Sequence, residues 1–212
     1  MRTKTLLLTA AISAVGLASS MAQAVYSVNY VGYVNKTLVP RFNLIANPLN
    51  NGNNQVATIL PSVPEGTTVY RFNGAGYDTS DYFFGAWSVP DLVLLPGSGF
   101  FIANPEATPV TVTFVGEGME GPNLMNNISP GLSLRSSKIP QAGDLTPGGN
   151  LEFPTPSEGD TVYKWLPGVQ NYSTHTFFFG AWDVAPALDV AEAVFYQANA
   201  ALAWERDFEV TP

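Results

Sequence analysis

Short runs of β-branched and aromatic residues recur along the whole chain. Residues 25–30 and 110–115 alternate in the manner of half-buried strands, and residues 67–72 are rich in β-branched and aromatic side chains. Such a period of two turns one face of a strand towards a core. Glycine and proline, with 19 and 17 residues, are spread between the runs and mark turns. The pattern predicts an all-β, antiparallel protein with little helix.

The chain carries one pattern twice. Sliding the sequence over itself by about 90 to 95 residues aligns four blocks in the same order. The aligned pairs are 42–44 with 132–134, 65–72 with 158–165, 82–87 with 177–182, and 97–101 with 191–195. Duplication explains four collinear matches far better than chance does. We therefore predict two tandem units, each an antiparallel β-sandwich or small barrel, related by a pseudo-twofold axis or by a translation.

The repeat also sets the predicted boundaries. The units cover 40–117 and 130–212, and the glycine-containing stretch 118–129 joins them as a linker. Residues 25–39 precede both units and are strongly β-forming. An extended segment of this kind needs a sheet edge, in its own chain or in a neighbouring one. Its tether to the chain favours the pairing within one molecule.

Two stretches depart from the strand pattern. Residues 55–60 suit a short helix, and residues 185–193 are rich in alanine, which has a high helix propensity. Residues 194–197 are nevertheless predicted to form a strand, because the repeat register places them there and tertiary context overrides propensity.

The N-terminus has the three parts of a secretory signal peptide. Arg2 and Lys4 precede an apolar stretch of 12 residues, and Ala22-Gln23-Ala24 supplies the small residues of a cleavage site. The apolar stretch is shorter than the roughly 20 residues needed to cross a bilayer. We therefore predict that residues 1–24 are removed, that the mature chain has no transmembrane segment, and that it is secreted to the periplasm, the cell surface or the medium.

In its repeated blocks the chain resembles a group of uncharacterised, exported bacterial two-repeat all-β proteins. The first unit carries the blocks Phe42-Asn43-Leu44-Ile45, Val69-Tyr70-Arg71-Phe72, Gly85-Ala86-Trp87 and Pro96-Gly97-Ser98-Gly99-Phe100-Phe101. The second unit departs from the pattern at Ala191-Glu192-Ala193. The resemblance implies an exported protein whose motifs are structural, and it brings no established activity.

Charge excludes one class of partner. Without the signal peptide the chain has 7 basic against 17 acidic residues, and so acidic a chain repels the phosphates of nucleic acids. It has no cysteine, so core burial must hold it together in place of disulfides. Charged residues make up 12% of the chain, about half the usual share. Such a weakly charged surface favours association.

Residue types that often carry catalysis are isolated in this sequence. His175 is the single histidine, is expected in a loop or at a strand edge, and has no serine and acid at a spacing that suggests a triad. Asp78-Thr79-Ser80 resembles the loop of aspartic proteases, but its copy is Ser173-Thr174-His175, which lacks the second carboxylate. Gly97-Ser98-Gly99 lacks the spacing of a nucleophile elbow and suits a β-turn. We predict no enzymatic activity, no catalytic residue and no cofactor.

Paired carboxylates offer a calcium site as an alternative to solvated loops. Glu117 and Glu120, or Asp78 and Asp81, could join backbone carbonyls around the ion. Calcium loops concentrate more oxygen ligands than either pair provides. We therefore predict no metal site.

Aromatic residues recur at matching positions of the two copies, which is typical of a duplicated core. We expect the following to be buried: Phe72, Phe84, Trp87, Phe101, Trp165, Phe179, Trp182 and Phe195. The alternative is a sugar-stacking platform on an exposed face, built from Tyr77, Tyr82, Trp87, Trp165, Tyr172 and Trp182.

Two function classes are consistent with these features. The first is a non-enzymatic secreted or cell-surface structural or adhesion protein, whose partners are itself or cell-surface polymers and which assembles by strand addition through residues 25–35. The second is an extracellular polysaccharide-binding module that uses exposed tryptophan and tyrosine. We expect the first.

Overall fold

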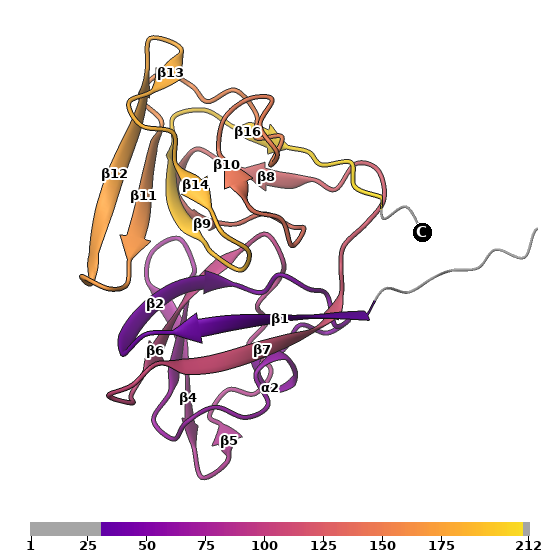
Figure 1. The fold of residues 1–212 in the computed structure, drawn as a ribbon, viewed down its shortest axis with the longest axis vertical. Helices are drawn as coiled ribbons and strands as arrows, with labels where there is room; N and C mark the ends of the chain where they lie inside the picture. The colour runs from indigo at the N-terminus through magenta and orange to yellow at the C-terminus, as the bar shows by residue number, and fades with distance from the viewer. Residues whose placement is uncertain (1–30, 210–212) are drawn as a thin grey trace, which may run out of the picture.

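The computed structural model describes residues 31–209 and divides them into two units of similar construction (Figure 1). The elements of the first unit are β1 (Val31–Leu38), β2 (Arg41–Ala46), α2 (Val56–Ile59), β3 (Thr68–Phe72), β4 (Tyr77–Phe83), β5 (Ala86–Trp87), β6 (Gly99–Asn104) and β7 (Val110–Glu117). Those of the second are β8 (Asn126–Ile128), β9 (Gly131–Arg135), β10 (Gly143–Asp144), β11 (Thr161–Leu166), β12 (Asn171–Phe178), β13 (Ala181–Trp182), β14 (Ala187–Leu188), β15 (Val194–Ala198) and β16 (Leu202–Trp204).

Each unit is a small sandwich of a sheet and a ribbon. The five-stranded sheets have the orders β2-β6-β3-β4-β5 and β9-β15-β11-β12-β13, which are equivalent strand for strand. The two-stranded ribbons are β1-β7 and β8-β16, and the second unit has in addition the short antiparallel pair β10-β14. In the first unit Phe114 of the ribbon packs in one core with Val69 and Ile102 of the sheet, and in the second Trp204 shares a core with Val162. The predicted all-β class with two tandem antiparallel units is confirmed.

The strand registers of the two units agree in detail. Val69 pairs with Ile102 on one side and with Ser80 on the other. Its counterpart Val162 pairs with Tyr196 and His175 at the matching positions. Because a slip of one residue would turn every side chain to the opposite face, this agreement shows that both copies keep the same inward-facing set.

The two units are related by a pseudo-twofold axis, and a translation is excluded. The backbone N–H of Ala46 donates to Ala191 O at 3.1 Å, and in the counterpart contact Ser136 donates to Gly97 O at 3.1 Å. The aromatic contacts between the units are reciprocal as well. The ring centroids of Phe72 and Phe195 lie 5.4 Å apart, and those of their counterparts Trp165 and Phe101 lie 5.5 Å apart. Such reciprocal contacts are the property of a twofold interface.

Strand pairing corrects the predicted boundaries. β1 lies in the segment 25–39 that was expected to precede both units, yet it pairs with β7 over eight positions and so belongs to the first unit. β8 lies within the predicted linker 118–129 and pairs with β16 of the second unit. Both strands complete a ribbon that covers one face of a sheet, and neither lies in one of the four aligned blocks. The predicted signal peptide (residues 1–24) and residues 25–30 lie outside the described residues.

The predictions for two single elements are confirmed. Residues 55–60 contain the helix α2, and residues 194–197 lie in strand β15, as predicted. The alanine-rich stretch 185–193 forms the short strand β14 and a turn. In that turn the φ angle of Ala191 is 59°, and that of its counterpart Gly97 in the first unit is 87°, so both are positive. The second unit therefore keeps the same turn although its sequence departs there.

Gly99 gives a direct test of the pseudo-twofold packing. A Cβ added to Gly99 would lie 2.5 Å from the Cβ of its counterpart Ala193. Gly99→Ala is therefore expected to lower the free energy of unfolding by about 1–3 kcal/mol through overpacking. The exchange Gly99→Ala with Ala193→Gly moves the small residue to the other unit and is expected to recover most of that loss. Denaturant unfolding of the three proteins measures this, and a double variant no more stable than Gly99→Ala would contradict it.

Candidate functional site

Two hairpin tips are repeated at opposite ends of the molecule. Phe84-Gly85 connects β4 with β5, and Phe179-Gly180 connects β12 with β13. The φ angles are 56° and 75° in the first loop and 55° and 77° in the second. Positive φ at both positions of a two-residue loop defines the type I′ turn, whose twist matches that of the flanking strands. In Figure 1 these hairpins form the lower and the upper end of the long axis.

A glutamate holds each tip. The backbone N–H groups of Phe84 and Gly85 donate to the carboxylate of Glu65 at 2.7 and 2.9 Å. Those of Phe179 and Gly180 donate to Glu158 at 2.8 and 2.9 Å. Hydrogen bonds to an ionised acceptor are stronger than neutral ones, so each tip is fixed in its conformation before any partner arrives.

Neither packing nor backbone preference explains phenylalanine at the tips. The side chains of Phe84 and Phe179 are 99% and 100% exposed. A bulky residue is disfavoured at positive φ, where asparagine or glycine is usual. The prediction that both residues are buried is wrong, because the two-residue loop directs their side chains away from the sheets. An apolar side chain kept twice in a strained, solvated position is a candidate contact residue.

An aromatic cavity lies where the two sheets face each other. It has a volume of about 320 Å³ and is lined by Phe42, Tyr70, Tyr77, Phe101, Trp165 and Tyr172. Tyr77 and Tyr172 are counterparts in the repeat, so the cavity sits beside the pseudo-twofold axis. Both are at the open rim, with exposed fractions of 44% and 36%.

Neighbouring residues fix the cavity walls. Trp165 Nε1 and Gln170 Nε2 both donate to Phe42 O at 2.9 Å. Phe101 forms the floor, and Trp165 stands edge-on to it with ring centroids 5.5 Å apart. Because the strands of two different units supply these residues, the cavity depends on how the units dock.

The structure brings together only some of the residues of the predicted sugar-stacking platform. Tyr77, Trp165 and Tyr172 come together in the cavity, joined by three residues outside the predicted platform, Phe42, Tyr70 and Phe101. Tyr82 and Trp87 are buried in the first core, and Trp182 packs against the second. Among the residues predicted to be buried, Trp87, Phe101 and Phe195 are buried, whereas Phe72, Trp165 and Trp182 are half-buried.

The rim tyrosine gives a pH-dependent test of this site. Burial, reinforced by the neighbouring Tyr77, raises the pKa of Tyr172 to about 12. Because the folded-state pKa exceeds the unfolded one of about 10, the folded state disfavours the ionised phenol. The contribution is complete below pH 10 and is lost between about pH 10 and 12. Ultraviolet titration of Tyr172→Phe should lack one ionisation near pH 12, and loss of an ordinary ionisation near pH 10 would contradict this.

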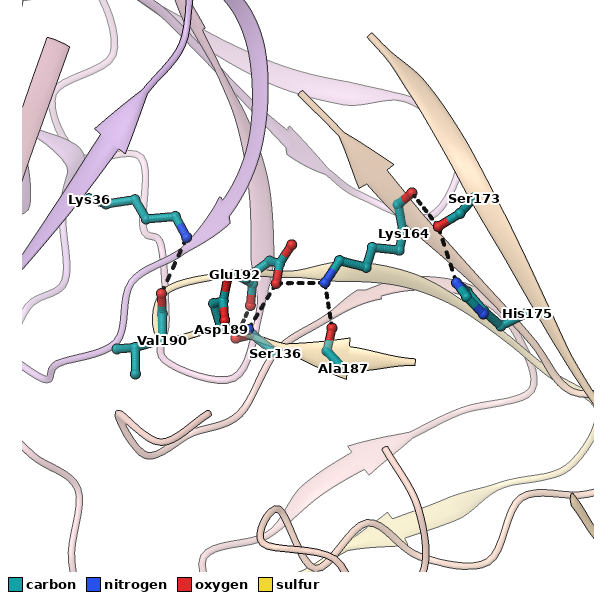
Figure 2. A network of polar contacts seen from close by, with 9 residues as sticks. All are labelled: Lys36, Ser136, Lys164, Ser173, His175, Ala187, Asp189, Val190 and Glu192. Carbon is teal, nitrogen blue, oxygen red and sulfur yellow. Dashed lines mark hydrogen bonds and ion pairs between the residues drawn. The ribbon is translucent and has the colours of Figure 1, made fainter. Parts of the chain in front are cut away.

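A polar network ties down the turn before β15 (Figure 2). Lys164 Nζ lies 3.1 Å from the carboxylate of Glu192 and donates to Ala187 O at 2.6 Å. The same carboxylate accepts from Asp189 N at 2.8 Å. Ser136 Oγ, just after β9 in the same unit, donates to Glu192 O at 2.7 Å. Since every contact ends on the backbone or on an internal ion pair, this network has a structural role.

His175 lies at one end of the same network and makes a contact that is equivalent to one in the first unit. Its Nε2 lies 3.1 Å from Ser173 Oγ (Figure 2). Its Nδ1 lies 2.9 Å from Val184 O. The counterpart Ser80 likewise contacts the carbonyl of Val89, at 3.2 Å. The group that would orient a catalytic histidine is here a backbone carbonyl and not a carboxylate. His175 lies within strand β12, not in a loop.

The remaining candidates are engaged locally. Asp78 forms an ion pair with Arg71 at 2.6 Å, and Asp81 accepts from Thr68 at 2.7 Å. Glu117 ends β7. Ser98 follows the turn residue Gly97, whose φ is 87°. Within residues 31–209, no three histidine, aspartate or glutamate side chains gather in a way that could hold a metal ion.

Comparisons with known proteins identify no relative. Neither family models, curated proteins nor solved structures match the chain. Within the described residues, no helix has the length and apolar character to cross a membrane.

Proposed function

We propose that the protein is a non-enzymatic, secreted or cell-surface structural and adhesion unit that associates with its own copies by inserting a phenylalanine tip into the aromatic cavity. The observation that carries the proposal is the duplicated, fully exposed phenylalanine on a rigid turn. The predicted export signal at residues 1–24 and the low charge of the rest of the chain agree with work at the cell exterior.

The cavity supports the choice of a second copy as the partner. It is lined by aromatic rings from Phe42 to Tyr172 and has a volume of about 320 Å³, enough for one aromatic side chain. Aromatic rings gain additional energy from edge-to-face contacts. The tips and the cavity lie on different parts of the surface, so the contact is heterologous. Contacts of this kind build closed rings where the rotation between copies closes, and open chains of molecules where it does not.

A comparison of the expected free energies predicts that a single contact between a tip and a cavity is weak. Burying one phenylalanine removes roughly 200 Å² of apolar surface from water, which yields about 5 kcal/mol at 25 cal/mol per Å². Association costs a comparable amount in translational and rotational freedom. The assembly should therefore grow with concentration and gain strength where several molecules are held together at a surface.

Sedimentation of the mature chain from micromolar to millimolar concentration tests the proposal. We expect the average mass to rise with concentration, and Tyr172→Ala, which removes part of the cavity rim, to suppress that rise. Tyr33→Ala is the matched control, because Tyr33 is 73% exposed and lies on β1, away from the cavity lining. A wild-type chain that remains monomeric throughout would overturn the proposal.

The mode of assembly differs from the one that the sequence suggested. Residues 31–38 form β1, which pairs along its whole length with β7 of the same chain. The proposal therefore places association at the tips and not at this strand.

A second candidate function is polysaccharide binding at the same cavity. The observation that favours it is the presence of three tyrosines and a tryptophan around an open apolar floor, since sugars stack their CH faces on such rings. The two functions separate by mutation. A sugar that occupies the cavity loses affinity on Tyr172→Ala but not when the tips are changed, whereas self-association is lost in both cases.

A further inference from the structure

A cationic cleft lies at the unit boundary, separate from the tips and the aromatic cavity. It consists of two neighbouring cavities of about 350 and 320 Å³ that share Leu95 and Ser98 in their walls. None of the aromatic-cavity residues lines it.

The charge of the cleft is opposite to that of the chain. Arg71, Arg135 and Lys138 line it, and none of its lining residues is acidic. The whole chain has 17 acidic and 9 basic residues, so this is a local concentration of positive charge. Arg71 is neutralised by Asp78 outside the cleft. Within residues 31–209, neither Arg135 nor Lys138 has an ion-pair partner.

The cleft differs in its charges from the place that is equivalent to it by the pseudo-twofold axis. The matching place at the other side of the boundary holds Lys164, the carboxylate of Glu192 and the core residue Ile45. Their counterparts in the cleft are Arg71, Ser98 and Arg135. One side thus has a cation neutralised by an internal carboxylate. On the cleft side Arg71 has its own carboxylate, Asp78, outside the cleft, Ser98 takes the position of Glu192, and Arg135 adds a second cation.

Arg135 occupies a costly position. Its counterpart Ile45 is 1% exposed in the first core, and desolvation by burial lowers the pKa of the Arg135 guanidinium. Its polar contacts are the neutral groups Ser133 Oγ at 3.1 Å and Asn126 Oδ1 at 3.5 Å. A partly buried cation without a counter-ion is destabilising unless an anion binds beside it.

The other walls suit a sugar chain. The cleft is lined by the amide of Asn127 and the hydroxyls of Ser98 and Ser133, which match the hydroxyl groups of a saccharide. Apolar side chains such as Phe72 offer surface for its CH groups. Two adjoining cavities provide room for more than one sugar residue.

We propose that this cleft binds an acidic oligosaccharide, with a sugar carboxylate held by Arg135 in the place that Glu192 fills on the other side of the boundary, and with Lys138 contacting a neighbouring residue of the glycan. Arg135 can offer two parallel N–H donors to a carboxylate. The inference does not rest on the proposed self-association, since different residues carry it.

Titration with trigalacturonic acid tests the inference on the mature full chain. Isothermal calorimetry at low salt is expected to detect binding that weakens at least tenfold for the fully methyl-esterified trimer, which has the same sugars without charge. Arg135→Gln should weaken binding of the acid at least tenfold and remove most of its preference over the ester. Affinity should also fall with added salt, because the attraction is electrostatic.

Two variants keep the test independent of folding. Arg41→Gln makes the same change of charge at an exposed arginine outside the cleft, and it should bind as the wild type does. Lys138→Gln should weaken binding as Arg135→Gln does. Absence of binding at millimolar trimer, equal affinity for acid and ester, or equal losses in Arg41→Gln and Arg135→Gln would each overturn the inference. Phe84→Asn with Phe179→Asn should leave this binding unchanged.

Discussion

Replacing Phe84 and Phe179 together by asparagine is expected to abolish self-association while raising the melting temperature. Asparagine accepts the left-handed backbone conformation that both loops require, whereas phenylalanine is strained there. Each replacement should add on the order of 1 kcal/mol to the free energy of unfolding, and together they should raise the melting temperature by several degrees. The two readouts are sedimentation and calorimetric unfolding.

The opposite signs of these effects make the prediction specific. A residue kept for stability should destabilise the fold when it is removed, but a residue kept for contact should not. Val169→Asn is a suitable control, because Val169 is a 70% exposed apolar residue in another loop. A double tip variant that still associates, or that unfolds at a clearly lower temperature, would contradict the assignment of the tips as contact sites.

Asp160→Ala is expected to produce the largest loss of stability. Asp160 is fully buried, and its carboxylate accepts from Tyr196 OH at 2.8 Å, Asn199 N at 2.7 Å and Ser157 N at 2.9 Å. Alanine would leave three donors without this acceptor, and one of them, the Tyr196 hydroxyl, is fully buried. The expected cost is about 3–5 kcal/mol, a large part of the roughly 5–15 kcal/mol that stabilises a typical domain.

Coupling with Tyr196 tests the cause of that loss. Burial, together with the hydrogen bond to Asp160, raises the pKa of the Tyr196 phenol far above its ordinary value, so the tyrosine remains a donor at any ordinary pH. Asp160→Ala should cost less in a Tyr196→Phe background, because one orphaned donor is already absent. Asp91→Ala, at an exposed aspartate, should be nearly neutral. Additive losses in the double variant would contradict this explanation.

Much of the fold could be predicted from the sequence because strand periodicity and duplication leave local marks. The alternation in residues 110–115 lies in β7, where Val112 and Phe114 point into the core. The paired blocks around Val69 and Val162 correspond to strands in the same register. The ribbon strand β8 was missed because it has three residues and no repeat signal.

The tips could not be predicted from hydrophobicity alone. The runs Tyr82-Phe83-Phe84 and Phe177-Phe178-Phe179 suggest buried strands, whereas the last residue of each lies in a turn. A signal was nevertheless present. A residue followed by glycine between two β-forming runs favours a two-residue hairpin, and the glutamate that holds each turn occurs in both copies, at 65 and 158.

The aromatic cavity could not be predicted from the sequence. Phe42 and Trp165 are 123 positions apart, and they meet because the units dock about a pseudo-twofold axis. The sequence was equally consistent with a translation, which would have placed these side chains on different faces. The cationic cleft depends on the same docking, since Arg71 and Arg135 come from different units.

The central claim is that a phenylalanine tip of one copy enters the aromatic cavity of another, and photo-cross-linking tests it most directly. The photoreactive phenylalanine analogue p-benzoylphenylalanine at position 84 keeps an aromatic group at the tip, and mixing with isotopically labelled wild-type chain distinguishes contacts between copies from contacts within one. Mass spectrometry should find cross-links between copies at the cavity residues Phe42, Tyr77 and Tyr172. Cross-links spread over the surface, or no more of them than with the analogue at position 169, would contradict the claim.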